Sequence, residues 1–233
     1  MAAAPFSVGW PRAIVFDLDG TLVDSAPDIQ LAINAAFAPL GVAPFELAQV
    51  KGLIGGGAPA AVARAAAMAG LTLAPDDEKA ALARFYPVYA EASAKGRGLY
   101  PGAAELLAHL TDRGIPLGLC TNKAEPITAI ALEALGIRPF FSAVVGARDD
   151  LPKKPDPTML RAAFTPLGAD AASVLMVGDT AADIGAAHAA GCRSIAISHG
   201  YSRVPVADLG ADGIIHHLAE LSGAIATLAP SGA

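Results

Sequence analysis

The stretch that most constrains the fold is Ala13–Phe16, four apolar residues that end directly before two acids. The run is short and partly β-branched, which is typical of a strand buried on both faces of a parallel sheet. Asp17 and Asp19 follow it, and Gly20 and Thr21 then permit and hold a sharp turn. Ligands of open parallel sheets bind beyond the carboxyl ends of the strands. The sequence therefore predicts a functional site at this strand end.

The two acids after this strand have two interpretations. They can be ordinary turn formers, because Asp is common in turns. Alternatively, they share a small site, where two bare carboxylates repel each other and need a divalent cation or a raised pKa on one of them. A second acidic cluster far along the chain, Asp179 and Asp183, favours the shared site.

From residue 100 onward, short apolar runs alternate with helical patterns. Strands are expected at residues 116–120, 142–145, 174–177, 194–198 and 213–215. Helices are expected at residues 103–113, 125–135, 157–167, 181–190 and 218–228. This alternation predicts an α/β fold in which a Rossmann-like parallel sheet carries helices on both faces.

The segment before residue 96 is different, because no strand is expected between residues 27 and 95. Helices are predicted at residues 27–40, 58–69 and 76–92, in a segment of about 70 residues, which is near the lower size of a domain. Since the first strand precedes this segment, we predict a discontinuous core of residues 1–25 and 96–233. Residues 26–95 are then a small all-helical cap domain inserted after the first strand, and residues 230–233 a loose tail.

Composition excludes several functions. The net charge of −6 and the lack of a basic run argue against nucleic-acid binding, so an anionic substrate must be attracted by a local cation. No stretch approaches about 18 uninterrupted apolar residues, and residues 1–10 lack a secretory signal's basic flank, so we expect a cytoplasmic protein without a membrane partner. Cys120 and Cys192 lack metal-ligand spacing, and we expect reduced core thiols.

Two further segments follow predicted strands and carry polar side chains. Thr121 and Asn122 offer a hydroxyl and an amide that can hold a phosphoryl oxygen, although simple turn chemistry is the alternative. Lys153 and Lys154 stand between prolines, which restrict the backbone so that an ammonium can be aimed. A solvated basic turn is the alternative for this pair.

The downstream acids stand at the end of the predicted strand 174–177. Asp179 is at its carboxyl tip, and Asp183 lies four residues later, one helical turn away on the same face. The two acids can therefore face one site together. A helix N-cap and a first-turn acid are the alternative.

These four segments, in this order, resemble the motifs of the haloacid dehalogenase superfamily and, within it, the phosphatases. Residues 16–25 are similar to the family's nucleophile-loop signature at every position. The resemblance implies that Asp17 is a nucleophile and Asp19 a general acid and base. It also implies that Thr121 orients the phosphoryl group and that Lys154 pairs with the nucleophile and the phosphate.

The resemblance also implies a magnesium site and further binding residues. Mg²⁺ would be held by Asp17, Asp19, Asp179 and Asp183, with Asp183 acting directly, through water, or as a partner of Lys154. Hard oxygen ligands are what Mg²⁺ prefers. The substrate-binding residues implied are Gly20, whose turn offers backbone N–H groups, Asn122, and Lys51 beside the glycine-rich residues 52–57. Lys51 is expected to bind a second anionic group such as a carboxylate.

The expected reaction is hydrolysis of a small phosphorylated metabolite through an aspartyl phosphate. Asp19 favours a phosphatase, because the superfamily's dehalogenases lack an acid at this position. Over its whole length the chain resembles bacterial phosphoglycolate phosphatases, notably at Leu22–Pro27, the cap glycines, Lys153–Pro157 and Gly200–Tyr201. The expected substrate is therefore 2-phosphoglycolate, and the expected assembly is a monomer or homodimer. A sugar phosphate, pyrophosphate, or a phosphoglucomutase-like phosphomutase activity remain open.

Overall fold

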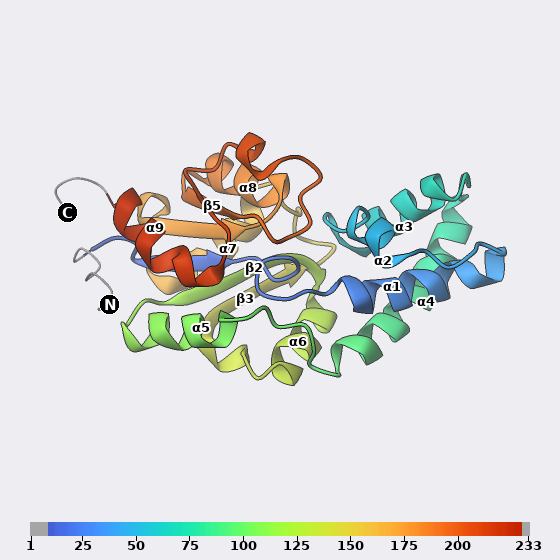
Figure 1. Ribbon diagram of the computed structural model, residues 1–233, viewed down its shortest axis with the longest axis horizontal. Coiled ribbons are helices and arrows are strands. Elements are labelled where there is room, and N and C mark those ends of the chain that lie inside the picture. The colour runs from blue at the N-terminus through green and yellow to red at the C-terminus, as the bar shows by residue number, and fades with distance from the viewer. Residues whose placement is uncertain (1–8, 230–233) are drawn as a thin grey trace.

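The structure is a computed structural model that describes residues 9–229. The expected tail at 230–233 and the start of the expected N-terminal core segment therefore lie outside the described residues. Figure 1 shows a layered part that contains the sheet and, beside it, a lobe built of α1, α2, α3 and α4. The predicted combination of a sheet-based core with an inserted helical segment is confirmed.

The described strands form one parallel sheet in the order β3-β2-β1-β4-β5-β6. Their bounds are β1 Ala13–Phe16, β2 Leu117–Ala124, β3 Phe141–Ala147, β4 Val174–Gly178, β5 Arg193–Ile197 and β6 Gly213–Ile215. The chain proceeds from β1 to β2 and β3 on one side, then returns to β4 on the other side of β1. The strand order therefore reverses at β1, whose carboxyl end is where ligands bind in such sheets.

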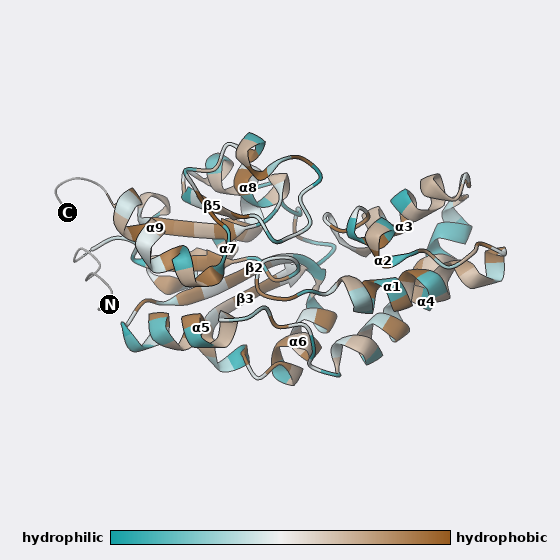
Figure 2. Ribbon diagram, viewed as in Figure 1, coloured by the Kyte–Doolittle hydropathy of each residue, from teal (hydrophilic) through white to brown (hydrophobic). Residues whose placement is uncertain are grey.

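Helices cover both faces of this sheet. They are α5 Ala103–Asp112, α6 Glu125–Ala134, α7 Thr158–Phe164, α8 Ala181–Ala190 and α9 Leu221–Leu228. On β1, Ile14 and Phe16 pack in a cluster with residues of α5 and α9, whereas Ala13 and Val15 pack with residues of α7 and α8. The continuous apolar character of β1 thus reflects burial on both sides, and Figure 2 shows that the strands are mostly apolar.

The inserted segment has its own apolar cluster. Its helices are α1 Ala26–Phe37, α2 Leu47–Lys51, α3 Gly57–Met68 and α4 Pro75–Ser93. Phe37 of α1 and Phe85 of α4 are buried in this cluster, and Ile127 and Tyr201 of the core also pack in it. The segment is therefore packed against the core in this structure. The domain boundaries expected after residue 25 and before residue 96 remain a prediction.

The chain leaves the core for the insert at one point and returns to the core at another, and these two segments run side by side. Val23 and Leu99 form an antiparallel bridge, and the N–H of Asp24 donates a hydrogen bond of 2.6 Å to the carbonyl oxygen of Gly98. Gly98 has a φ of +87°, and a Cβ there would lie 2.4 Å from the carbonyl oxygen of Asp24. Only glycine permits so close an approach in this backbone conformation.

The structure differs from the sequence-based expectation at several element boundaries. The strand expected to end at Cys120 continues to Ala124, because β2 keeps pairing with β3 after a register shift. The helix expected over residues 27–40 ends at Phe37 and continues as a 3₁₀ turn that contains Pro39. Helix α2 was not expected. It is stabilised by reciprocal hydrogen bonds between Glu46 and Gln49.

Two further expectations concern cysteines and membranes. Cys120 and Cys192 are both free and buried, which confirms the prediction of unbridged core thiols. Among the described residues, no helix combines the length and apolar character needed to cross a membrane.

Candidate active site

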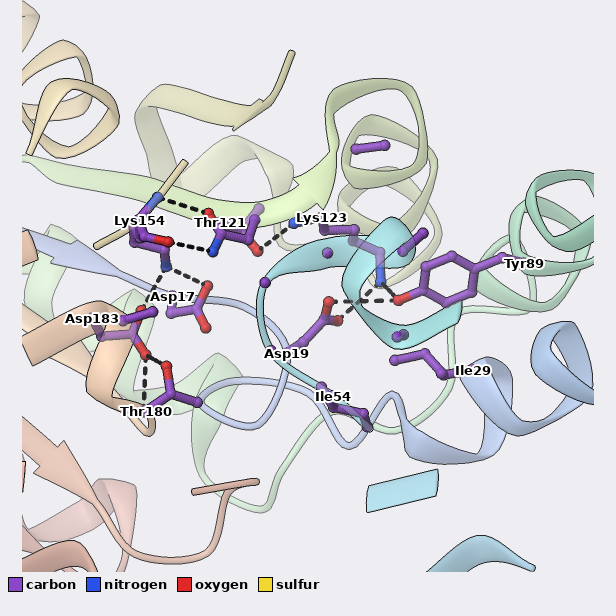
Figure 3. A pocket seen from close by; sticks show the side chains of 18 of the residues that line it. Asp17, Asp19, Ile29, Ile54, Tyr89, Thr121, Lys123, Lys154, Thr180 and Asp183 are labelled. Atoms are coloured by element: carbon purple, nitrogen blue, oxygen red, sulfur yellow. Dashed lines mark hydrogen bonds and ion pairs between the residues drawn. The ribbon is translucent and has the colours of Figure 1, made fainter. Parts of the chain in front are cut away.

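The carboxyl ends of three neighbouring strands bring the sequence-predicted residues together. Asp17 follows β1, Thr121 lies near the end of β2, and Asp179 follows β4. The loop before α7 adds Lys154, and the first turn of α8 adds Asp183. Figure 3 shows Lys154 and Asp183 on one side of Asp17. Most of these side chains line one cavity, between the core and the inserted helices.

Lys154 is the central cation of this cluster. Its ammonium Nζ lies 2.9 Å from Asp17 Oδ1, 2.6 Å from Asp183 Oδ1 and 2.6 Å from the carbonyl oxygen of Cys120. Burial disfavours the charge on this side chain, but Asp17 and Asp183 outweigh burial and raise the pKa of Lys154 above its usual value. Lys154 therefore stays charged and neutralises part of the acidic cluster.

Asn122 supports the Lys154 backbone. Its amide Nδ2 donates to the Lys154 carbonyl oxygen at 3.0 Å, and the Lys154 N–H donates to Asn122 Oδ1 at 3.0 Å. Both ends of the amide are thus engaged with the lysine loop. The expected substrate contact of Asn122 stays a prediction, for which the second N–H of its amide is the donor that these two bonds do not use.

Asp17 has one engaged and one available carboxylate oxygen. Oδ1 accepts from Lys154, while Oδ2 receives no hydrogen bond from the residues that the structure describes. Burial raises the pKa of Asp17 to about 7, with Lys154 opposing the shift and the charge of Asp183 adding to it. A buried carboxylate with a free oxygen is suited to attack an electrophile once its charge is stabilised.

Asp179 is fully buried and held on both sides. Its Oδ1 accepts from the Thr21 hydroxyl at 3.0 Å, and its Oδ2 accepts from the Tyr201 N–H at 2.6 Å. Burial raises the pKa of Asp179, and the charges of Asp183 and Asp17 add to the shift. Gly20 lies against this carboxylate with a φ of +90°, where a Cβ would be 2.3 Å from Asp179 Oδ2. Gly20 is therefore a packing requirement of the site.

Asp183 combines the two roles that its sequence position suggested. Its Oδ2 accepts from the N–H of Thr180 at 2.9 Å and from the Thr180 hydroxyl at 2.6 Å, which closes a capping box at the start of α8. Its Oδ1 accepts from Lys154. Asp183 is thus a first-turn acid of α8 and a contact of Lys154, while the N-cap of this helix is Thr180 and not Asp179.

Three carboxylates can hold a divalent cation here. Asp17, Asp179 and Asp183 each offer one oxygen, and these oxygens lie within 4.8 Å of one another. Burial raises the pKa of Asp17 and Asp179, and repulsion between the acids adds to it. Buried like charges with hard oxygen donors fit Mg²⁺, which would relieve that repulsion. The carboxylate of Asp19 is not in this group. Its side chain lies on the other side of Asp17, toward Tyr89 (Figure 3).

Asp19 instead contacts two residues that the sequence analysis did not assign to the site. The ammonium of Lys123 lies 2.9 Å from Asp19 Oδ1, and the Tyr89 hydroxyl lies 3.5 Å from Asp19 Oδ2. Lys123 stands two residues after Thr121, a spacing that puts two side chains on the same face of a regular strand, and both residues line the cavity. Had β2 been expected to continue to Ala124, this periodicity would have pointed to Lys123. Tyr89, near the C-terminal end of α4, carried no such signal.

The inserted segment supplies an apolar wall to the cavity. Its contribution consists of Ile29, Ile54, Gly55, Gly56, Gly57, Ala58, Ala61, Phe85, Tyr86 and Tyr89. The space open to the centres of water-sized molecules is about 50 Å³, which is room for a few waters or a small ligand. Arg64 holds the glycine-rich loop through hydrogen bonds to the carbonyl oxygens of Leu53 and Gly55.

Lys51 is not brought to this cavity. It is exposed at the end of α2 and is not among the lining residues. Its expected role in binding a second anionic group has no support from its position. By contrast, the Tyr201 segment borders the site, since the Tyr201 N–H donates to Asp179 Oδ2. The Tyr201 hydroxyl donates to Asp24 Oδ1 at 2.6 Å and accepts from the N–H of Ala26 at 3.0 Å.

Comparison with known proteins agrees with this geometry. Residues 11–191 match the family model of the haloacid dehalogenase-like hydrolases. The chain is 44% identical over 226 residues to a phosphoglycolate phosphatase of Rhodospirillum rubrum, covering 95% of this chain and 94% of the relative.

Solved structures share this fold. A crystal structure described as a predicted phosphoglycolate phosphatase from Haemophilus somnus superposes with a TM-score of 0.85 at 33% identity, over 92% of this chain and 98% of that one. CbbY of Rhodobacter sphaeroides, in complex with xylulose-(1,5)bisphosphate, superposes with a TM-score of 0.75 at 28% identity, over 90% and 96%. The strand-end acids, the lysine that pairs with them and the extent of these matches lead to one conclusion: the chain belongs to the haloacid dehalogenase-like hydrolases, with phosphatases among its relatives.

Proposed function

We propose that this chain is a Mg²⁺-dependent phosphatase that hydrolyses 2-phosphoglycolate to glycolate and phosphate. The observation that carries the proposal is the arrangement around Asp17. The buried Asp17 carboxylate has one free oxygen and belongs to the metal-competent cluster, and the Asp19 carboxylate lies on its other side. Similarity to phosphoglycolate phosphatases over nearly the whole chain supports the choice of substrate.

In this mechanism Asp17 is the nucleophile. Its free Oδ2 attacks phosphorus, the bond between phosphorus and the ester oxygen breaks, and an aspartyl phosphate forms. Lys154 fixes the other oxygen of Asp17 and offsets its charge. Thr121 orients the phosphoryl group. Its Oγ1 accepts from the Lys123 N–H at 3.3 Å, which leaves its own proton free to donate.

Asp19 transfers a proton in both half-reactions. As an acid it protonates the leaving ester oxygen, and as a base it then takes a proton from the water that hydrolyses the aspartyl phosphate. The side chain is suited to this because it lies in the same cavity as Asp17 but does not join the metal-competent carboxylates. Water attack on phosphorus returns Asp17 to its free form.

The metal would be held by Asp17 and Asp179, with Asp183 as a ligand or as an acceptor for bound water. When bound, Mg²⁺ supplies positive charge that reduces repulsion between the acidic site and the phosphate dianion. Asp183 already accepts hydrogen bonds at both carboxylate oxygens, from Lys154 and from Thr180. A water-mediated role for Asp183 leaves these bonds intact.

The cavity supports a small leaving group. Its small free volume and the apolar wall from α1, α3 and α4 fit a two-carbon acid better than a nucleotide. Two buried, free cysteines agree with a reducing, cytoplasmic location for this activity.

The proposal is tested with a panel of phosphate esters. The purified protein is assayed with 2-phosphoglycolate, glucose 6-phosphate, pyrophosphate and p-nitrophenyl phosphate, with Mg²⁺ or with a chelator. We expect phosphate release that requires Mg²⁺, with kcat/KM for 2-phosphoglycolate at least about tenfold above the others. Equal turnover of all esters would overturn the substrate assignment. Conversion of glucose 6-phosphate to its 1-phosphate isomer without phosphate release would identify a phosphomutase instead.

A further inference from the structure

Both oxygens of the Asp19 carboxylate have a partner, and the two partners come from different parts of the molecule. Lys123, at the end of core strand β2, is ion-paired to Oδ1 at 2.9 Å. Tyr89, on helix α4 of the inserted segment, approaches Oδ2 at 3.5 Å through its hydroxyl. Lys123 also donates a hydrogen bond to the Tyr89 hydroxyl, so the three side chains form a closed triangle.

Lys123 is buried, and its ammonium lies within this triangle. Its side chain is only 3% exposed, and its ammonium also lies 4.2 Å from the centre of the Tyr89 ring. A buried ammonium needs a carboxylate partner, because the cost of removing it from water is otherwise not recovered. Asp19 is the carboxylate in contact with it, and Asp28 on α1 adds a more distant negative charge.

The site therefore has two lysines that contact different acids. Lys154 contacts Asp17 and Asp183, whereas Lys123 contacts Asp19. Figure 3 shows these two groups on opposite sides, with Lys154 beside Asp17 and Lys123 between Asp19 and Tyr89. Asp19 is thus drawn away from the metal-competent cluster and toward the apolar wall of the inserted segment, where a leaving group would lie.

We propose that Lys123 and Tyr89 are positioning residues that hold the Asp19 carboxylate toward the leaving group of the substrate. Because Tyr89 belongs to the inserted segment, the complete triangle exists only while that segment is packed on the core. The acid is then set in place in the same arrangement that closes the cavity. This inference rests on the proposed function in one respect, which is that Asp19 protonates the leaving group.

The proposal predicts a dependence on the leaving group. An alkoxide is strongly basic and needs a proton as it departs, whereas p-nitrophenolate is a weak base and departs without one. The parameter kcat/KM reports steps up to formation of the aspartyl phosphate, so it isolates this proton transfer from the later water attack. Misplacing the acid should therefore lower kcat/KM for alkyl phosphates only.

The test uses three substrates, namely 2-phosphoglycolate, ethyl phosphate and p-nitrophenyl phosphate. The variants are Lys123→Met and Tyr89→Phe, with Lys79→Met as a control because Lys79 is exposed on the same helix as Tyr89. For Lys123→Met we expect kcat/KM to fall about 10- to 100-fold with both alkyl phosphates and less than about threefold with p-nitrophenyl phosphate. For Tyr89→Phe, which keeps the ring, we expect the same selectivity with a loss of about three- to tenfold.

A second measurement separates positioning from a general structural role. In an Asp19→Asn background, adding Lys123→Met should cause no further loss, because the group that Lys123 positions is already absent. Lys123→Arg, which keeps the charge and the donor, should restore part of the activity on alkyl phosphates. Thermal unfolding of each variant identifies any that fail to fold, and the conclusion then depends on Tyr89→Phe.

Three results would overturn the inference. Equal loss on all three substrates would mean that Lys123 acts on phosphoryl transfer as a whole. A loss confined to 2-phosphoglycolate would mean that Lys123 binds the carboxylate of the substrate. No loss on any substrate would mean that Asp19 needs no support. Failure of the proposed function is distinct from these, because it would appear in the wild-type protein as equal kcat/KM for 2-phosphoglycolate and ethyl phosphate.

Discussion

The main-chain N–H of Tyr201 donates a hydrogen bond of 2.6 Å to Oδ2 of Asp179. This bond joins the loop after β5 to the acid after β4, and together with the Thr21 hydroxyl it fixes a carboxylate that has two other acids nearby. Gly200 makes the approach possible, because a Cβ at this position would lie 2.2 Å from the Cβ of Asp179. The orientation of a potential metal ligand thus depends on a glycine more than twenty positions away.

Gly200→Ala should therefore weaken metal binding. The added methyl group must displace the loop or Asp179, and loss of such outer support lowers metal affinity about 10- to 100-fold. Titration calorimetry with Mg²⁺ measures this directly. Gly223→Ala is the matched control, since nothing lies within 4 Å of a Cβ there. Unchanged Mg²⁺ affinity in Gly200→Ala would contradict the assignment of Asp179 as a ligand.

Asp17→Asn should abolish turnover while leaving the fold intact. The amide is a far weaker nucleophile, and loss of a nucleophile lowers kcat by at least about 10³-fold in enzymes of covalent mechanism. Lys154 keeps Asp183 as its ion-pair partner in this variant, so the cluster retains a compensated charge. Steady-state assays with 2-phosphoglycolate measure the loss, and circular dichroism checks the fold. Retention of most of the activity would exclude Asp17 as the attacking group.

Lys154→Met should destabilise the metal-free protein. The change leaves Asp17 and Asp183 as buried acids without their cation, and breaking a buried ion pair in this way costs about 3–5 kcal/mol. Urea unfolding in the presence of a chelator measures the free energy of unfolding. Lys153→Met, one residue earlier and half-buried, is the control and should change it by less than about 1 kcal/mol. Similar losses in both variants would argue against the central role of Lys154.

The stability of the metal-free protein should fall as the pH rises from about 4 to about 7. The pKa of Asp17 is raised from 3.8 to about 7 in the folded protein, chiefly by burial. Over this range the folded state therefore binds more protons than the unfolded state, so raising the pH favours unfolding. Urea midpoints in chelator across this range measure the effect.

The Asp17→Asn variant is the comparison for this pH effect, since an amide does not titrate. It should show a smaller decline in stability than the wild-type protein over the same range. Added Mg²⁺ should stabilise the wild-type protein more at the upper end of the range, where the carboxylates are ionised. Identical pH profiles for the two proteins would show that Asp17 is not the group responsible.

Much of the fold could be predicted from local patterns. The short apolar runs that precede Asp17 and Asp179 are buried strands, and the helices between them cover the sheet as their alternation predicts. The end of β2 could not be located, because Thr121 and Asn122 are polar residues within a strand. They are tolerated there because they face a site and not the apolar core.

Within the candidate site, the sequence could identify the residues that follow predicted strands. Asp17, Lys154 and Asp183 are adjacent in space because the topology brings strand ends together, and that topology has a sequence pattern. Lys123 was missed because the strand that carries it was expected to end at Cys120. Tyr89 was missed for a different reason. Its contact with Asp19 depends on how α4 packs against the core, and no local pattern encodes the placement of one packed lobe on another.

The antiparallel bridge between Val23 and Leu99 has a consequence for how such proteins diversify. The chain departs from the core and rejoins it at two neighbouring points, so an insert of another length or composition needs only two adjacent joints. Exchange of the insert would leave the nucleophile in place while replacing both the wall that faces the substrate and Tyr89, which contacts Asp19. A new insert must therefore supply its own partner for this acid, so substrate selectivity and proton transfer change together in this architecture.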